Sequence, residues 1–106
     1  MLYLTNSLSL NMMRREGHDL ALRPITVEGA KNLLRAEYIC AIGHADTARL
    51  VGDILGLNIL PYRLTVELTP SDSLLVAQYR GPRLEPGTTK LPEGASIEFW
   101  QVYHLD

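Results

Sequence analysis

The residues best suited to binding or catalysis lie where an apolar run meets a predicted helix, in Ala41-Ile42-Gly43-His44-Ala45-Asp46-Thr47. A glycine at such a junction lets a bulky ligand approach the backbone. We expect His44 at the amino-terminal end of the helix, where unpaired N–H groups and the helix dipole favour phosphate. A histidine, with an ordinary pKa near ~6.5, donates protons close to neutral pH. This combination suits phosphodiester chemistry. The alternative is that His44 only caps or packs at the junction.

Other polar groups at the predicted ends of elements could bind a phosphate. They are Ser9, Asn11, Arg63, Arg80, Arg83 and Glu85. The planar fork of an arginine donates two parallel hydrogen bonds and therefore suits phosphate oxygens. Taken singly, each arginine is better explained as a solvated surface residue.

The sequence lacks the residue patterns that several other kinds of site require. The three histidines show no ligand spacing with one another or with Cys40, so we expect no metal site. His18 in particular is expected in a solvated turn. The glycine patterns of phosphate loops and dinucleotide sites are absent. A Ser–His–acid hydrolase is not excluded, although no serine lies on a nucleophile elbow. We therefore expect no cofactor.

The composition indicates one ordinary globular domain over residues 1–106, with 46% hydrophobic and 21% charged residues. A net charge of −2 argues against a protein that coats duplex nucleic acid. The single cysteine, Cys40, indicates a reducing compartment. No apolar run approaches the ~20 residues of a membrane span, and the first residues do not resemble a signal peptide. We therefore expect a cytoplasmic protein without membrane contact.

The pattern of apolar residues predicts an α+β fold, in which two or three helices flank a mixed sheet of about five strands. The segments with strand character are 2–4, 20–23, 38–42, 62–69, 74–79 and 96–103. We expect Pro24 to end the second of these, and 62–69 to form a hairpin with 74–79.

Capping residues in the sequence predict where two helices begin or end. Thr26 is a good N-cap for a helix running to about Ala36, with Ile25 and Ala30 placed as a hydrophobic staple. A second helix over 46–55 should end at Gly56 as a left-handed cap. A short helix could begin at Met12. The stretch 81–94, rich in proline and glycine, cannot be a regular element, and loops of this length are usually functional or mobile.

Several of these segments, in their order along the chain, resemble the viral anti-CRISPR ring nuclease family. The most specific are Ile42-Gly43-His44, with the helix after it, and Arg80-Gly81-Pro82-Arg83-Leu84. The other matching positions are Tyr3-Leu4-Thr5-Asn6-Ser7-Leu8-Ser9, Thr47-Ala48, Leu55-Gly56 and Arg63. The resemblance covers nearly the whole chain and depends on order and spacing together.

The resemblance implies a homodimer that holds cyclic tetra-adenylate, the second messenger of type III CRISPR defence, in a cleft across its two-fold axis. It implies metal-independent cleavage by the substrate's own 2′-hydroxyl, giving linear di-adenylate with a 2′,3′-cyclic phosphate. His44 would be the general acid, and Arg83 would contact the phosphate near the scissile bond. The implied ligand-binding residues are Ser9, Asn11, Gly43, Arg63 and Arg80.

One position departs from the family pattern. The family usually has Arg-Leu-Pro-Glu-Gly with a functional glutamate before the glycine, whereas this chain has Arg83-Leu84-Glu85-Pro86-Gly87. Either Glu85 or, less favourably, Glu93 could take that catalytic role. The exchange keeps a second hypothesis open, a binding module that sequesters the ring without cutting it. A third is a structural or regulatory viral protein with no nucleotide affinity.

Overall fold

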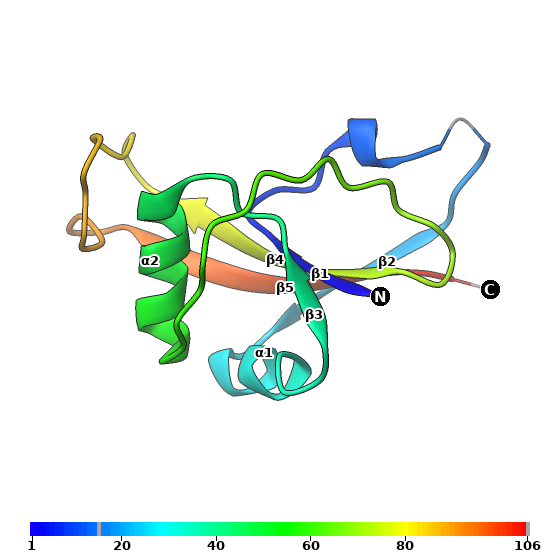
Figure 1. Cartoon of the computed structure of the whole chain (residues 1–106), viewed down its shortest axis with the longest axis horizontal. Helices are drawn as coiled ribbons and strands as arrows, with labels where there is room; N and C mark the ends of the chain where they lie inside the picture. The colour runs from blue at the N-terminus through cyan, green and yellow to red at the C-terminus, as the bar shows by residue number, and fades with distance from the viewer. Residues whose placement is uncertain (15, 106) are drawn as a thin grey trace.

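Residues 1–14 and 16–105, which the computed structural model describes, form an α+β fold with one mixed sheet of five strands in the order β2-β5-β4-β1-β3. The strands are β1 (Leu2–Thr5), β2 (Leu20–Ile25), β3 (Tyr38–Cys40), β4 (Ser73–Arg80) and β5 (Ser96–His104). β1 runs parallel to both β3 and β4, whereas β5 runs antiparallel to β4 and β2 (Figure 1). The predicted fold class is confirmed.

The two faces of the sheet bury different clusters, because successive side chains of a strand point to opposite sides. On β4, Leu75 and Ala77 pack into the cluster that includes helices α1 (Val27–Leu33) and α2 (Ala45–Leu55). Leu74 and Val76 pack into the other cluster. That second face is covered by the short 3-10 helix η1 (Leu10–Met12) and by the stretch containing Val66 and Leu68.

Both predicted helix caps are present. The Thr26 hydroxyl accepts a hydrogen bond from the Gly29 N–H at 3.0 Å, at the start of α1. Gly56 ends α2 in the left-handed conformation, with φ of 67°. The first cap fixes where α1 begins, and the second fixes where α2 ends. Within the described residues, no helix is long and apolar enough to cross a membrane.

Two strand predictions are wrong. Among the residues that the structure describes, the stretch 62–69 forms no strand, because β4, its expected partner, already pairs with β1 and β5 on its two sides. β2 does not stop at Pro24 and continues to Ile25. β2 is an edge strand of the described sheet, beside β5, and an edge strand tolerates proline because its outward side needs no N–H donor.

Candidate functional site

A hollow of about 500 Å³ opens at the amino-terminal end of α2. We call it the His44 hollow, and its lining residues are Asn6, Ala41, Gly43, His44, Arg63, Leu64 and Thr65. Its volume falls in the range of small-ligand pockets, ~300–1,000 Å³. Three of the residues singled out from the sequence, Gly43, His44 and Arg63, therefore share one concave surface.

His44 is the N-cap residue of α2, and its extended backbone has φ of −109° and ψ of 129°. Its carbonyl accepts the Ala48 N–H at 3.0 Å, but its side chain makes no capping hydrogen bond. The side chain is also exposed rather than packed in the core. The imidazole is therefore available to a ligand at a helix end where N–H groups favour anions.

Arg63 reaches the hollow because its segment lies alongside the end of β3, where the Tyr62 N–H donates to the Ile42 carbonyl at 2.8 Å. A Cβ atom added to Gly43 would lie 3.2 Å from the Cγ of Arg63. Gly43 does not have a positive φ. The glycine therefore makes room for the arginine side chain rather than for an unusual backbone conformation.

Asn6 belongs to the hollow although it was quoted from the sequence only as part of a family motif. It is the first residue after β1, whereas Gly43 and His44 lie three and four residues after the end of β3, and the two strands are parallel. The carboxyl ends of parallel strands meet at one edge of a sheet, which is where α/β sheets commonly bind ligands. A polar residue directly after a predicted strand could have indicated Asn6 as a site residue. That inference also needed the parallel pairing of β1 with β3, which the sequence does not show.

Arg83 and Glu85 do not line the His44 hollow. Both are exposed in the loop between β4 and β5, which extends past the amino-terminal end of α2 (Figure 1). The loop is nevertheless bonded to that helix, since the Gly87 N–H donates to the Asp46 carboxylate at 2.8 Å. Asp46 is two residues from His44, so the loop is held near the histidine.

Arg80 lines a different hollow, of about 370 Å³, on the sheet face opposite the helices. Its other lining residues are Leu8, Leu22, Val76, Gln78, Trp100 and Val102. The Arg80 Nε atom lies 3.0 Å from a carboxylate oxygen of Glu98. The hydrogen bond from Arg80, with a second one from Trp100, holds the pKa of the Glu98 carboxyl below its usual range. Arg80 is thus already paired with a carboxylate of its own chain.

Ser9 and Asn11 form a local cap, in which the Ser9 hydroxyl accepts the Asn11 N–H at 3.2 Å at the start of η1. Neither residue lines the His44 hollow or the Arg80 hollow. The structure therefore separates the sequence-predicted residues into four places: the His44 hollow, the loop beside it, the Arg80 hollow and the η1 cap.

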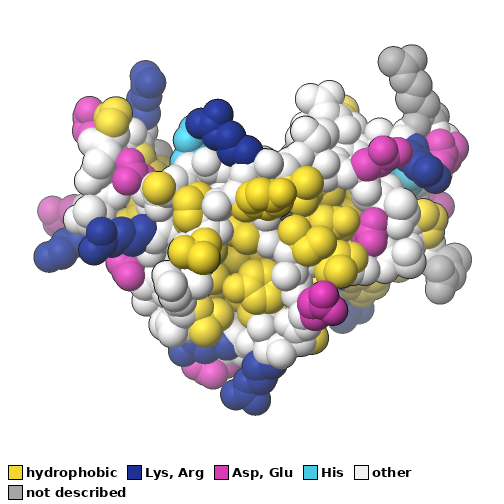
Figure 2. Space-filling model, viewed as in Figure 1, with side chains coloured by type: hydrophobic (Ala, Val, Ile, Leu, Met, Phe, Trp, Pro, Cys, Tyr) yellow, Lys and Arg dark blue, Asp and Glu magenta, His cyan; other side chains and the backbone are white. Residues whose placement is uncertain are grey.

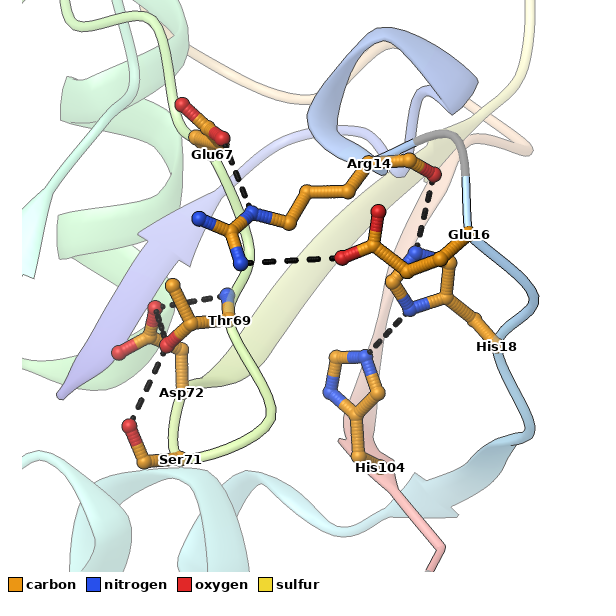
Figure 3. A network of polar contacts seen from close by, with 8 residues as sticks. All are labelled: Arg14, Glu16, His18, Glu67, Thr69, Ser71, Asp72 and His104. Atoms are coloured by element: carbon orange, nitrogen blue, oxygen red, sulfur yellow. Dashed lines mark hydrogen bonds and ion pairs between the residues drawn. The ribbon is translucent and has the colours of Figure 1, made fainter.

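His18 is not the isolated turn residue expected from the sequence. Its Nδ1 lies 3.0 Å from Nε2 of His104 on β5, and its Nε2 lies 3.0 Å from the Arg14 carbonyl (Figure 3). The Arg14 side chain in turn contacts Glu67 at 3.2 Å. These contacts fasten the segment after η1 to its neighbours. In the part of the chain that the structure describes, no three His, Cys, Asp or Glu side chains gather to hold a metal.

Comparisons with known proteins agree with this fold. The model of the STIV B116-like family matches residues 2–99. "Uncharacterized protein 26" of Sulfolobus islandicus filamentous virus (isolate Iceland/Hveragerdi) is 34% identical over 88 residues, or 82% of this chain and 74% of the relative. The structure of B116 of Sulfolobus turreted icosahedral virus superposes with a TM-score of 0.82 at 26% identity, covering 97% of this chain and 98% of B116. The chain therefore belongs to the STIV B116-like family of viral proteins.

Proposed function

We propose that this protein binds cyclic tetra-adenylate and cleaves it without a metal, with His44 as the general acid. The observation that carries the proposal is the His44 hollow. There an exposed histidine at a helix N-terminus, whose side chain makes no capping hydrogen bond, shares a concave surface with Arg63. The family resemblance of Ile42-Gly43-His44 and Arg80-Gly81-Pro82-Arg83-Leu84 supports the same assignment.

The reaction needs few groups from the protein. The 2′-hydroxyl of the substrate attacks the neighbouring phosphorus and loses its proton to water. The bond from phosphorus to the 5′ oxygen breaks, and protonated His44 gives its proton to that oxygen. The products are a 2′,3′-cyclic phosphate and a 5′-hydroxyl. Because the nucleophile is already tethered beside the phosphate, the protein mainly fixes the in-line geometry. Arg63 and the first N–H groups of α2 stabilise the charge that develops on the phosphate oxygens.

A two-fold ring suits a two-fold dimer, which would bring one His44 to each of two opposite phosphates. An apolar surface beside the hollow supports such an assembly. Leu60 and Tyr62 are 69% and 59% exposed, and Leu64, which lines the hollow, is 38% exposed. Hydrophobic side chains gather broadly over the face in Figure 2, and large exposed apolar patches mark interaction sites.

The second candidate is a module that sequesters the ring without turnover. One observation favours it: Arg83 and Glu85, the other two catalytic candidates, lie outside the His44 hollow. In the ring-nuclease proposal, these residues act from the loop held against α2 by the bond between Gly87 and Asp46. In the sequestering alternative, they contribute at most to affinity.

The test is a single-turnover reaction with excess protein, radiolabelled cyclic tetra-adenylate and EDTA. Conversion to linear di-adenylate ending in a 2′,3′-cyclic phosphate would support the ring nuclease. An intact ring that migrates with the protein on a native gel would instead support the sequestering module. A ring that is neither cut nor bound, with linear tetra-adenylate as the control ligand, would refute both.

A further inference from the structure

We infer that Asp46 is a positioning residue, whose carboxylate holds the β4–β5 loop in register with His44. This inference rests on the proposed function, because the loop carries Arg83 and Glu85. The contact is the hydrogen bond of 2.8 Å from the Gly87 N–H to Asp46 Oδ2, which joins residues 41 positions apart. Among the described residues, it is the one hydrogen bond recorded between this loop and α2.

The chain around Gly87 is built to present that N–H. The Thr88 N–H donates to the Glu85 carbonyl at 3.1 Å, so residues 85–88 form a β-turn. Proline suits the second position of such a turn, and Gly87, with φ of 82°, supplies the positive φ that a type II turn needs at its third position. The N–H of that third residue has no partner inside the turn. It is therefore free to bind the carboxylate of Asp46.

This turn also accounts for the exchanged residues at this position. Pro86 followed by Gly87 presets the two corner conformations, and Glu85 then supplies the carbonyl that closes the turn. A proline before the glutamate, as in the usual family order, would move the proline out of the corner position of this turn. The order Glu85-Pro86 therefore matches a loop that is docked by its glycine.

Other contacts restrict the loop to the same place. The Tyr79 hydroxyl donates to the Pro82 carbonyl at 2.6 Å and closes the base of the loop. A Cβ on Gly81 would lie 2.7 Å from the Ala95 Cβ, so the two ends of the loop cross closely. Further along, Leu91 lies with Leu50 of α2 around a shared shallow hollow. Asp46 fixes the remaining part, the segment next to His44.

The alternative is that Asp46 acts by charge, because a carboxylate in the first turn of a helix interacts with the helix dipole. Two substitutions distinguish these roles. Asp46→Ala removes both the charge and the acceptor, whereas Asp46→Asn removes the charge and keeps an acceptor oxygen. Glu28→Ala is the matched control, since Glu28 is an exposed carboxylate in the first turn of the other helix, α1.

The measurements are single-turnover cleavage of cyclic tetra-adenylate across pH, the NMR shift and exchange rate of the Gly87 amide, and native-state trypsin cleavage after Arg83 and Lys90. We expect Asp46→Ala to slow cleavage about 10- to 100-fold, because a small misplacement of reacting groups has effects of that size. The midpoints of the pH profile should stay unchanged. The Gly87 amide should exchange faster and trypsin should cut the loop faster in Asp46→Ala. Asp46→Asn should restore most of the rate, and Glu28→Ala should behave as wild type.

An Asp46→Ala rate equal to wild type would overturn the inference. So would an Asp46→Asn variant as slow as Asp46→Ala, or shifted pH midpoints, because either result would mean that the charge of Asp46 acts on His44 directly. If the wild type does not cut the ring, the proposed function fails, and so does the part of this inference that concerns catalysis. The Gly87 amide and the trypsin rates would then still report separately whether Asp46 holds the loop.

Discussion

Replacing Gly43 with alanine tests whether the glycine exists to admit Arg63 to the His44 hollow. The added Cβ would lie 3.2 Å from the Arg63 Cγ but 3.9 Å from the Arg63 Cα. The arginine side chain must therefore move by a few tenths of an ångström or rotate away, while the backbone can stay in place. Since Gly43 does not have a positive φ, alanine fits its backbone without strain.

The effects on stability and on ligand affinity should differ. Replacing glycine by alanine at a compatible position stabilises by ~0.4–1 kcal/mol through the unfolded chain, which offsets the close contact. We therefore expect the free energy of unfolding to change by less than ~1 kcal/mol, or about 4–8 °C in Tm. A hydrogen bond to a charged group contributes ~1.5–3 kcal/mol, and each ~1.4 kcal/mol is tenfold in affinity. Displacing Arg63 should weaken ring binding about tenfold or more.

The assay is a double-mutant cycle of Kd for cyclic tetra-adenylate, with thermal unfolding of each variant. Gly43→Ala and Arg63→Ala should each weaken binding, and the Gly43 substitution should add little once Arg63 is gone. Gly17→Ala is the control, because no atom of the described residues lies within 4 Å of a Cβ at Gly17. Full additivity of the two losses, or unchanged affinity in Gly43→Ala, would refute the reasoning.

Two further substitutions test the framework. Gly52→Ala would place a Cβ 2.6 Å from the Leu57 carbonyl oxygen, and overpacking of this kind costs ~1–3 kcal/mol; an unchanged Tm would show that this crossing is looser than described. Asp72→Ala should cost ~1–3 kcal/mol, because the carboxylate accepts the Thr69 N–H at 3.0 Å and hydroxyl at 2.8 Å. Burial raises the Asp72 pKa, but the Thr69 hydrogen bonds and the terminal ammonium outweigh it, so the pKa is lowered. Stabilisation by Asp72 is therefore present above the unfolded pKa of ~3.9 and is lost as pH falls through the lower folded pKa. A gap between wild type and Asp72→Ala in denaturant titrations that does not narrow as pH falls below ~3.9 would contradict this.

Local signals in the sequence predicted the first residue of α1 and the last residue of α2 correctly, because the partners of each cap lie within a few residues. The other end of α1 was expected at about Ala36 but lies at Leu33. The Thr26 cap bonds Gly29, and Gly56 needs only a left-handed conformation. Strand pairing was harder to predict. Residues 62–69 alternate as a strand should, and the burial of Val66 and Leu68 satisfies that alternation without any sheet partner. Which strands occupy the sides of β4 depends on the whole chain.

The candidate site likewise has one part that local sequence predicts and another that depends on contacts between distant segments. His44 could be placed at a helix N-terminus from the residues around it. The hydrogen bond between Tyr62 and Ile42 holds the neighbouring Arg63 at the hollow. The hydrogen bond between Gly87 and Asp46 holds the β4–β5 loop beside it. These contacts join distant segments and have no local pattern. Asn6 and the pairing of His18 with His104 were missed for the same reason.

The most direct test of the central claim compares wild type with His44→Ala in single-turnover cleavage of cyclic tetra-adenylate, together with the affinity of both proteins for the ring. His18→Ala is the control, because His18 pairs with His104 away from the His44 hollow. General acid catalysis contributes ~10²–10⁴-fold, so we expect His44→Ala to lose at least ~100-fold in rate while its Kd stays within about threefold. Cleavage by His44→Ala at the wild-type rate would contradict the assignment of His44 as the acid.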